Sequence, residues 1–90
     1  MVIRFFAGLR EITRADQLRL TDPPADVAAL VQVLVEHYGK PLRGAIMSGE
    51  GLSDAVVVLV NGHNIRLSAG ADTPLSADDE VALFPMVSGG

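Results

Sequence analysis

The sequence has no cysteine, a single lysine and only four aromatic residues among its 90 amino acids. The lack of cysteine excludes disulfides, thiolate metal sites and cysteine nucleophiles. Because aromatic residues are scarce, Val, Leu, Ile and Ala must supply most of the packing. Apolar residues make up 49% of the chain, which is typical of a folded protein, and the length predicts one domain over residues 1–90.

Clustered positive charge is also missing, since the net charge is −4 and the six arginines are scattered. We therefore expect no nucleic-acid partner and no anionic membrane surface as a partner. An acidic carrier that docks on basic proteins fits this charge, and so does an ordinary solvated surface. No apolar run approaches the roughly 20 residues that span a bilayer, and no signal-peptide pattern is visible, so we expect a cytoplasmic protein.

Alternating apolar residues predict that the chain begins with a strand over Val2–Ala7. This alternation places Ile3 and Phe5 on one face, with Arg4 and Phe6 on the other. We expect a loop from Gly8 through Arg10 and Glu11. A second short strand, antiparallel to the first, is predicted over Gln17–Leu20.

The strongest helix pattern in the sequence follows Asp26, which is well placed to accept hydrogen bonds at the helix N-terminus. Apolar residues then recur with helical spacing and form a wide stripe. They are Val27, Leu30, Val31, Leu34, Val35 and Tyr38. Gly39 and Pro41 predict that this helix ends near residue 38.

The second half of the sequence predicts shorter elements and a final strand over Glu80–Phe84. Asn61-Gly62 is a strong signal for a tight hairpin turn between two strands. The expected elements before the final strand are a helical turn at Leu42–Met47, a surface loop at Ser48–Asp54, and strands at Val56–Val60 and His63–Leu67. Leu75 is predicted to pack on the core.

The order of these elements indicates an α+β protein with a β-grasp architecture. We expect a mixed sheet of about five strands packed on one main helix. Ile3, Phe5, Val81 and Leu83 are predicted to face that helix. Phe6 and Phe84 would then lie together on the opposite face as an exposed apolar patch, which is a common mark of a partner surface.

Few residues in the sequence have the pattern of a catalytic or metal-binding site. His37 and His63 are far apart, with no ligand partners at metal-binding spacing, so we expect no metal site. The consecutive acids Asp78, Asp79 and Glu80 are best explained by turn formation and a solvated strand start. No nucleophile motif or phosphate-binding loop stands out, and we therefore expect that the chain is no enzyme.

The Gly89-Gly90 pair follows directly on the final predicted strand. Glycines can thread a narrow channel in backbone conformations that are closed to other residues. A terminal carboxylate is a poor electrophile, so a partner would have to activate it before any group transfer. The alternative is a frayed end on an interaction domain that has no terminal chemistry.

Three segments resemble the MoaD/ThiS family of ubiquitin-like sulfur carriers. They are VIRFFAGLRE at residues 2–11, Val60-Asn61-Gly62, and DEVALFPMVSGG at residues 79–90. The similarity is greatest to MoaD-like members, the small subunits of molybdopterin synthase, whose tails usually read Phe-Pro-Pro-Val-x-Gly-Gly. Met86 replaces the second proline of that pattern, and Asp78 stands where the family often has glycine.

This resemblance implies a ubiquitin-like fold and a cycle in which partners supply the chemistry. A MoeB/ThiF-like enzyme would use ATP to adenylate Gly90, and a sulfur donor would convert the adenylate to a thiocarboxylate. A MoaE-like large subunit of molybdopterin synthase would then accept the sulfur, for a molybdenum or tungsten cofactor. The chain itself would bind no cofactor.

By position, the resemblance makes Gly90 the sulfur-bearing residue and Gly89 its neighbour in the partner's channel. We expect the partner-binding residues to be Phe84, Pro85, Met86, Val87, Ser88, Arg10 and Phe6. Three alternatives stay open at this point: a sulfur carrier for thiazole or cysteine synthesis, a protein modifier joined to lysines through Gly90, and an interaction domain.

Overall fold

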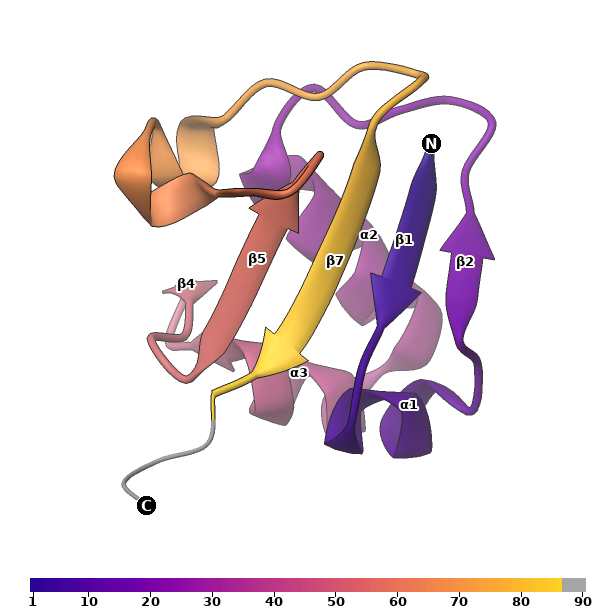
Figure 1. The fold of residues 1–90 in the computed structure, drawn as a ribbon. Helices are drawn as coiled ribbons and strands as arrows, with labels where there is room; N and C mark the ends of the chain where they lie inside the picture. Colours follow the sequence, from indigo (N-terminus) through magenta and orange to yellow (C-terminus); the bar gives the residue numbers. More distant parts are fainter. Residues whose placement is uncertain (87–90) are drawn as a thin grey trace.

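The computed structural model describes residues 1–86, which form a mixed sheet with helices packed on one face (Figure 1). The strands of this sheet are β1 (Val2–Phe5), β2 (Gln17–Arg19), β5 (Val56–Val60), β6 (His63–Asn64) and β7 (Glu80–Pro85). A small separate hairpin consists of β3 (Met47–Ser48) and β4 (Gly51–Leu52). The helices are α1 (Gly8–Thr13), α2 (Val27–Tyr38) and α3 (Lys40–Ile46), with 3-10 turns η1 (Ile65–Leu67) and η2 (Gly70–Asp72).

The five strands lie in the order β2-β1-β7-β5-β6, so the first and last long strands are central neighbours. β1 and β7 are parallel, whereas the other neighbouring pairs are antiparallel. The parallel register sets Ile3 opposite Val81 and Phe5 opposite Leu83. The predicted β-grasp fold, with its mixed five-stranded sheet, is therefore confirmed.

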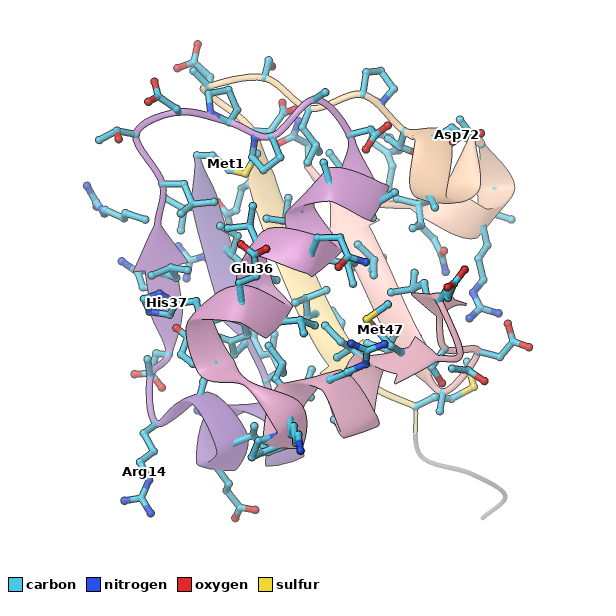
Figure 2. The ribbon with its side chains drawn as sticks, turned by 180° about the vertical axis from the view of Figure 1, so that it is seen from behind. Met1, Arg14, Glu36, His37, Met47 and Asp72 are labelled. Atoms are coloured by element: carbon cyan, nitrogen blue, oxygen red, sulfur yellow. The ribbon has the colours of Figure 1, made fainter. Side chains whose placement is uncertain are left out.

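The core lies between the sheet and the helices, which cross behind the strands in Figure 1 and in front of them in Figure 2. Ile3, Phe5, Val81 and Leu83 are each at most 1% exposed, as their alternation predicts. From α2 the core receives Val27, Leu30, Val31 and Leu34. These buried side chains give the sheet and helix layers a shared apolar interior, which is the main source of stability.

Both ends of α2 have the predicted chemistry. Asp26 Oδ1 accepts a hydrogen bond from the Ala29 amide at 2.9 Å, which satisfies one free donor of the first turn. Gly39 has φ +81°, and its amide donates to the Val35 carbonyl at 2.7 Å. A residue with a side chain would be strained in this left-handed conformation, so glycine stops the helix here.

One prediction about helices is wrong. The loop expected from Gly8 through Arg10 and Glu11 is the helix α1, which buries Leu9 and Thr13 on one side. The expected main helix is α2, and the helical turn expected at Leu42–Met47 is the helix α3, so residues 1–86 contain three α-helices. α3 already begins at Lys40, because proline is tolerated in the first turn, where its missing amide has no partner to lose.

Two predictions about the second half are also wrong. The expected loop at Ser48–Asp54 contains the β3–β4 hairpin, in which Met47 pairs with Leu52. The strand expected over His63–Leu67 stops at Asn64, whose Oδ1 accepts from the Arg66 amide at 2.9 Å and starts the turn η1. An asparagine cap competes with strand pairing here, an effect that the apolar pattern does not reveal.

The predicted tight turn at Asn61-Gly62 is confirmed. Asn61 has φ +51° and Gly62 has φ +83°. Positive φ at both central residues is the mark of a type I′ turn, which matches the twist of the two strands that it joins. The turn brings β6 back along the outer edge of β5.

Candidate functional site

The candidate site is the end of β7, because the four residues to which the sequence analysis assigns the reactive end follow shortly after this strand. The predictions for Val87, Ser88, Gly89 and Gly90 lie outside the described residues. We call Pro85 and Met86 the tail root. Pro85 lies opposite Val56 of β5, and the Met86 amide donates to the Ala55 carbonyl at 2.7 Å. The backbone is therefore tied to β5 and to the residue that precedes it as far as Met86, whose side chain is half exposed.

Phe6 and Phe84 stand next to the tail root and contact each other, as predicted. Their rings stack with centroids 4.4 Å apart and planes 15° apart. The Phe6 amide donates to the Leu83 carbonyl at 3.1 Å, so the parallel pairing of β1 with β7 continues beyond β1. Each ring covers part of the other, and both side chains are half-buried. The two rings, which we call the phenylalanine pair, are less exposed than expected.

The phenylalanine pair belongs to the open face of the sheet, the face turned away from the helices. On β5, Val57 lies opposite Phe84 and Leu59 lies opposite Ala82. All four are partly exposed. With Phe6, the residue that follows β1, they form a continuous apolar strip across β5, β7 and the end of β1, because alternate residues of an extended chain share a face.

A hollow of about 260 Å³ extends this strip towards the β5–β6 turn. It is lined by Leu59, Asn61, Gly62, Glu80 and Ala82. Such an apolar surface with a polar margin is typical of a protein-binding face. Val57, Leu59 and Ala82 were not among the predicted partner residues, although the continuous apolar run Val56–Val60 contained the signal.

Charged side chains border the apolar strip on the open face. Arg4 Nε lies 2.6 Å from Glu80 Oε1, and both side chains are about half exposed. An exposed ion pair of this kind contributes little to stability. The ion pair matters through its position, because it places two opposite charges beside Ala82, where a docking partner would contact them.

Arg10, also predicted to face partners, lies on α1 and is exposed. Its Nη1 is 3.7 Å from Asp16 Oδ1, a long and solvent-exposed pairing. Its guanidinium remains available to a second protein, as does the side chain of the helix-ending residue Arg14 (Figure 2).

At the other end of β7, Asp79 joins the strand to the β5–β6 turn. Its carboxylate accepts from Asn61 Nδ2 at 2.8 Å and from the Ser76 amide at 2.8 Å. The bond from Asn61, followed by that from Ser76, lowers the pKa of Asp79. The Glu80 amide in turn donates to Asn61 Oδ1 at 2.9 Å. The structure thus confirms turn formation by the acidic run. It also shows that Asn61, besides forming the β5–β6 turn, holds the start of β7 through its side chain.

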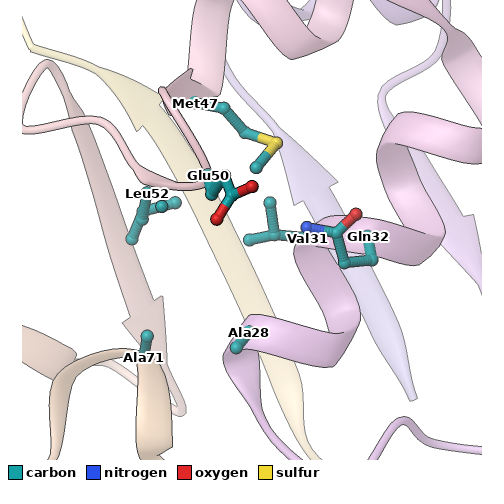
Figure 3. A pocket seen from close by; sticks show the side chains of 8 residues that line it. Ala28, Val31, Gln32, Met47, Glu50, Leu52 and Ala71 are labelled. Atoms are coloured by element: carbon teal, nitrogen blue, oxygen red, sulfur yellow. The ribbon is translucent and has the colours of Figure 1, made fainter.

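A second, smaller cavity of about 60 Å³ lies on the helix side, below the β3–β4 hairpin (Figure 3). Val31, Met47 and Leu52 form its apolar wall, and the side chains of Gln32 and Glu50 lie at its rim. This volume corresponds to a few water molecules at most. It offers no arrangement of groups that could carry out chemistry.

Within residues 1–86, no three His, Asp or Glu side chains come together as a potential metal site. His37 instead packs its ring edge-on against Tyr38, with centroids 4.6 Å apart. Tyr38 also packs edge-on against Phe5, and partial burial raises the pKa of its hydroxyl. These aromatic contacts pack the end of α2 against the sheet and do not form a reactive site.

None of the helices in the described part of the chain is long and apolar enough to cross a membrane.

Comparison with known proteins shows similarity over nearly the whole chain. The model of the ThiS family matches residues 3–90. A protein from Archaeoglobus fulgidus described as a candidate sulfur carrier is 34% identical over 64 residues, which cover 71% of this chain and 73% of that protein.

Solved structures are also similar to nearly the whole chain. Small archaeal modifier protein 1 from Methanosarcina acetivorans superposes with a TM-score of 0.81 and 29% identity, covering 99% of this chain and 94% of that one. A chain of the Amycolatopsis orientalis BexX/CysO complex has a TM-score of 0.82, covering 99% and 98% of the two chains. Its identity is 20%, so this last likeness concerns the fold alone.

Proposed function

The chain belongs to the ThiS family, and we propose that it is a sulfur carrier whose Gly90 holds sulfur as a C-terminal thiocarboxylate. The observation that carries the proposal is the family match through residue 90, which includes the open face, the tail root and the Gly-Gly pair. The similarity to the Archaeoglobus protein supports the same role.

The proposed chemistry begins with activation of the Gly90 carboxylate by ATP. A carboxylate oxygen attacks the α-phosphorus, pyrophosphate leaves, and an acyl-adenylate forms. A sulfide then attacks the activated carbonyl carbon, a carbon–sulfur bond forms, and AMP departs. Activation is required because a free carboxylate does not expel oxide, whereas the adenylate carries a good leaving group.

We assign the catalytic groups of these steps to partner enzymes. The groups that this chain contributes are a docking surface and a reactive end. The apolar strip, with the phenylalanine pair beside the tail root, is the proposed docking surface for a MoeB/ThiF-like adenylating enzyme. A partner that covers this strip is well placed to receive the residues that follow Met86, since strip and tail root adjoin on β7.

A more specific proposal is that the acceptor is a MoaE-like large subunit of molybdopterin synthase. Phe84-Pro85-Met86 and the Gly-Gly pair are similar to the tails of MoaD-like carriers. In that role, two successive thiocarboxylates would supply the two sulfurs of a dithiolene that binds molybdenum or tungsten. Carriers for thiazole or cysteine synthesis remain the alternative acceptor pathways for the same chemistry.

Intact-mass spectrometry of the full chain tests the carrier function. After incubation with ATP, the cognate activating enzyme and sulfide, we expect a mass increase equal to the replacement of one oxygen by one sulfur. A variant that lacks Gly90 should show no increase, although it keeps the whole described domain. If the complete chain gains no sulfur with a catalytically competent cognate enzyme, the proposal is wrong.

A second candidate function is conjugation to other proteins through Gly90. The observation that favours it is the similarity to small archaeal modifier protein 1 along almost the whole chain. Conjugation would give lysine-linked adducts that survive reducing denaturation, whereas a pure carrier would give only the thiocarboxylate. Blotting of cell extracts for a tagged chain, with the Gly90 deletion as control, distinguishes the two.

A further inference from the structure

Arg66 lies in η1, distant in sequence from the tail, yet its side chain reaches the turn that precedes β5. Its Nη2 donates to the Ser53 carbonyl at 3.2 Å and lies 3.4 Å from the Val56 carbonyl. Its Nη1 is 3.4 Å from Asp54 Oδ1. One guanidinium therefore bridges both ends of the short segment 53–56.

The same segment holds the tail root. Ala55 lies between the two carbonyls that Arg66 contacts, and its own carbonyl accepts the hydrogen bond from Met86 at 2.7 Å. Ser53 Oγ also accepts from the Ala55 amide at 3.0 Å, which sets the orientation of this peptide. Arg66 is thus linked to Met86, the last described residue, through its bond to the Val56 carbonyl, the backbone between Val56 and Ala55, and the bond from Met86 to Ala55.

The position of β6 explains why an arginine is needed here. β6 pairs only with Leu59 and Val60, so the first part of β5 is an edge on that side. Because Ala55 directs its carbonyl at Met86, the alternation of strand carbonyls turns that of Val56 towards this open edge. The Arg66 guanidinium supplies the donor that a neighbouring strand would otherwise provide.

We propose that Arg66 is a positioning residue that holds the backbone in place at Met86. It acts through the segment 53–56, and it keeps the Ala55 carbonyl where the Met86 amide can bind it. The consequence for the proposed carrier function is that the backbone is held at Met86, beside the apolar strip on which a partner would dock. This consequence rests on the proposed function, whereas the link between Arg66 and Met86 does not.

Three arguments indicate that Arg66 acts through its hydrogen bonds to the Ser53 and Val56 carbonyls and not through its ion pair with Asp54. The ion pair with Asp54 is weak, since that side chain is 99% exposed. A guanidinium can direct several N–H groups at once to separate acceptors. A lysine ammonium is a compact point charge and does not reproduce that planar fork, so Arg66→Lys should restore only part of the effect.

Amide hydrogen exchange on the full chain tests the structural link without any partner. In Arg66→Gln we expect the Met86 amide to exchange about tenfold faster than in the wild type, because one stabilising hydrogen bond is worth about that factor. The amides of Leu59 and Leu83, which lie within the paired part of the sheet, should keep their protection. Arg19→Gln, at the opposite edge of the sheet, is the matched control and should leave Met86 unchanged.

Steady-state activation of Gly90 tests the functional consequence. With the cognate activating enzyme, ATP and sulfide, Arg66→Gln should lower kcat about tenfold while KM stays within twofold, since the docking strip is intact. Arg66→Lys should give an intermediate kcat, and Asp54→Asn should resemble the wild type. A purely structural role of Arg66 would instead lower thermal stability and leave kcat of the folded fraction unchanged.

Unchanged Met86 exchange in Arg66→Gln would overturn the inference at its first step. Faster exchange with an unchanged kcat would overturn the assignment of Arg66 to tail presentation. If the wild-type chain itself is never activated, the proposed carrier function fails, and the exchange measurement still decides whether Arg66 controls the tail root.

Discussion

Both faces of the central sheet carry apolar side chains, but helices cover only one of the two faces. On the helix side, Ile3, Val81 and Leu83 are at most 1% exposed. On the open face, Ala82 and Phe84 lie on the same strand β7 and remain partly exposed. Adjacent residues of one strand therefore belong to two different faces of the sheet. The helices α2 and α3 cover the face that carries Val81 and Leu83.

This difference indicates that the two faces are under different physical demands. Covering the inner face removes apolar area from water and stabilises the fold. The open face keeps its apolar strip available, at a cost in stability that the stacking of Phe6 on Phe84 reduces. Substitutions on the two faces should consequently separate folding from partner binding.

The largest expected effect is on folding, from Leu83→Ala on the covered face. This change leaves a cavity among close-packed neighbours and should lower the free energy of unfolding by about 2–5 kcal/mol. Chemical denaturation followed by circular dichroism measures it. A loss below about 1 kcal/mol would show that the inner face is less well packed than its burial indicates.

The next effect is on binding, from Phe84→Ala, one residue further along the same strand. Losing the stacked ring should cost only about 1 kcal/mol of stability. Affinity for the activating enzyme should fall by about 30-fold, the usual effect of removing a central aromatic anchor. Isothermal titration calorimetry measures this affinity, with Arg19→Ala on β2 as the surface control. Equal affinities for both variants would place the docking surface elsewhere.

Asp26→Ala tests whether the helix layer can be weakened without changing the open face. Removal of the carboxylate that binds the Ala29 amide should cost about 1 kcal/mol of stability. The affinity of the folded protein for the partner should not change, because α2 lies behind the sheet (Figure 1). A parallel drop in stability and affinity would contradict the independence of the two faces.

The smallest effect concerns Asp79, whose pKa is lowered mainly by the hydrogen bond from Asn61. Because the folded-state pKa lies below that of the unfolded chain, the ionised carboxylate stabilises the fold at neutral pH. This contribution is lost as the pH falls through the folded-state pKa. The stability difference between wild type and Asp79→Asn, measured by urea denaturation, should therefore be present at pH 7 and vanish well below pH about 4.

Asp78→Asn is the control for the acidic turn, since it removes the same charge from the neighbouring position. Its stability relative to the wild type should not follow the pH dependence shown by Asp79→Asn. Should both variants behave alike, net charge rather than the bond from Asn61 would explain the effect.

Parts of the candidate site were accessible from local patterns and parts were not. The proximity of Phe6 and Phe84 followed from the alternation in two strands and from the expected fold, and the structure confirms it. Arg10 and the four residues that follow Met86 were assigned through family resemblance, and their roles stay predictions. The bond from Met86 to the Ala55 carbonyl has no sequence signal, because every residue has the same backbone carbonyl.

The sequence by itself determined those features that depend on neighbours in the chain. Alternation assigned β1 and β7 their buried faces, helical spacing gave the stripe of α2, and Asn61-Gly62 specified a type I′ turn. α1 escaped detection because it is only six residues long, too short for a clear apolar period. Local rules act over a few residues, and they work best where a long element repeats them.

Tertiary structure alone decided which strands meet and which distant groups cooperate. The parallel pairing of β1 with β7 brings residues about 80 positions apart into contact and creates the apolar strip. The contact of Arg66 with the turn before β5 depends on the position that η1 takes in the fold after β6 ends. Such contacts depend on how the layers pack, and packing is a property of the whole chain.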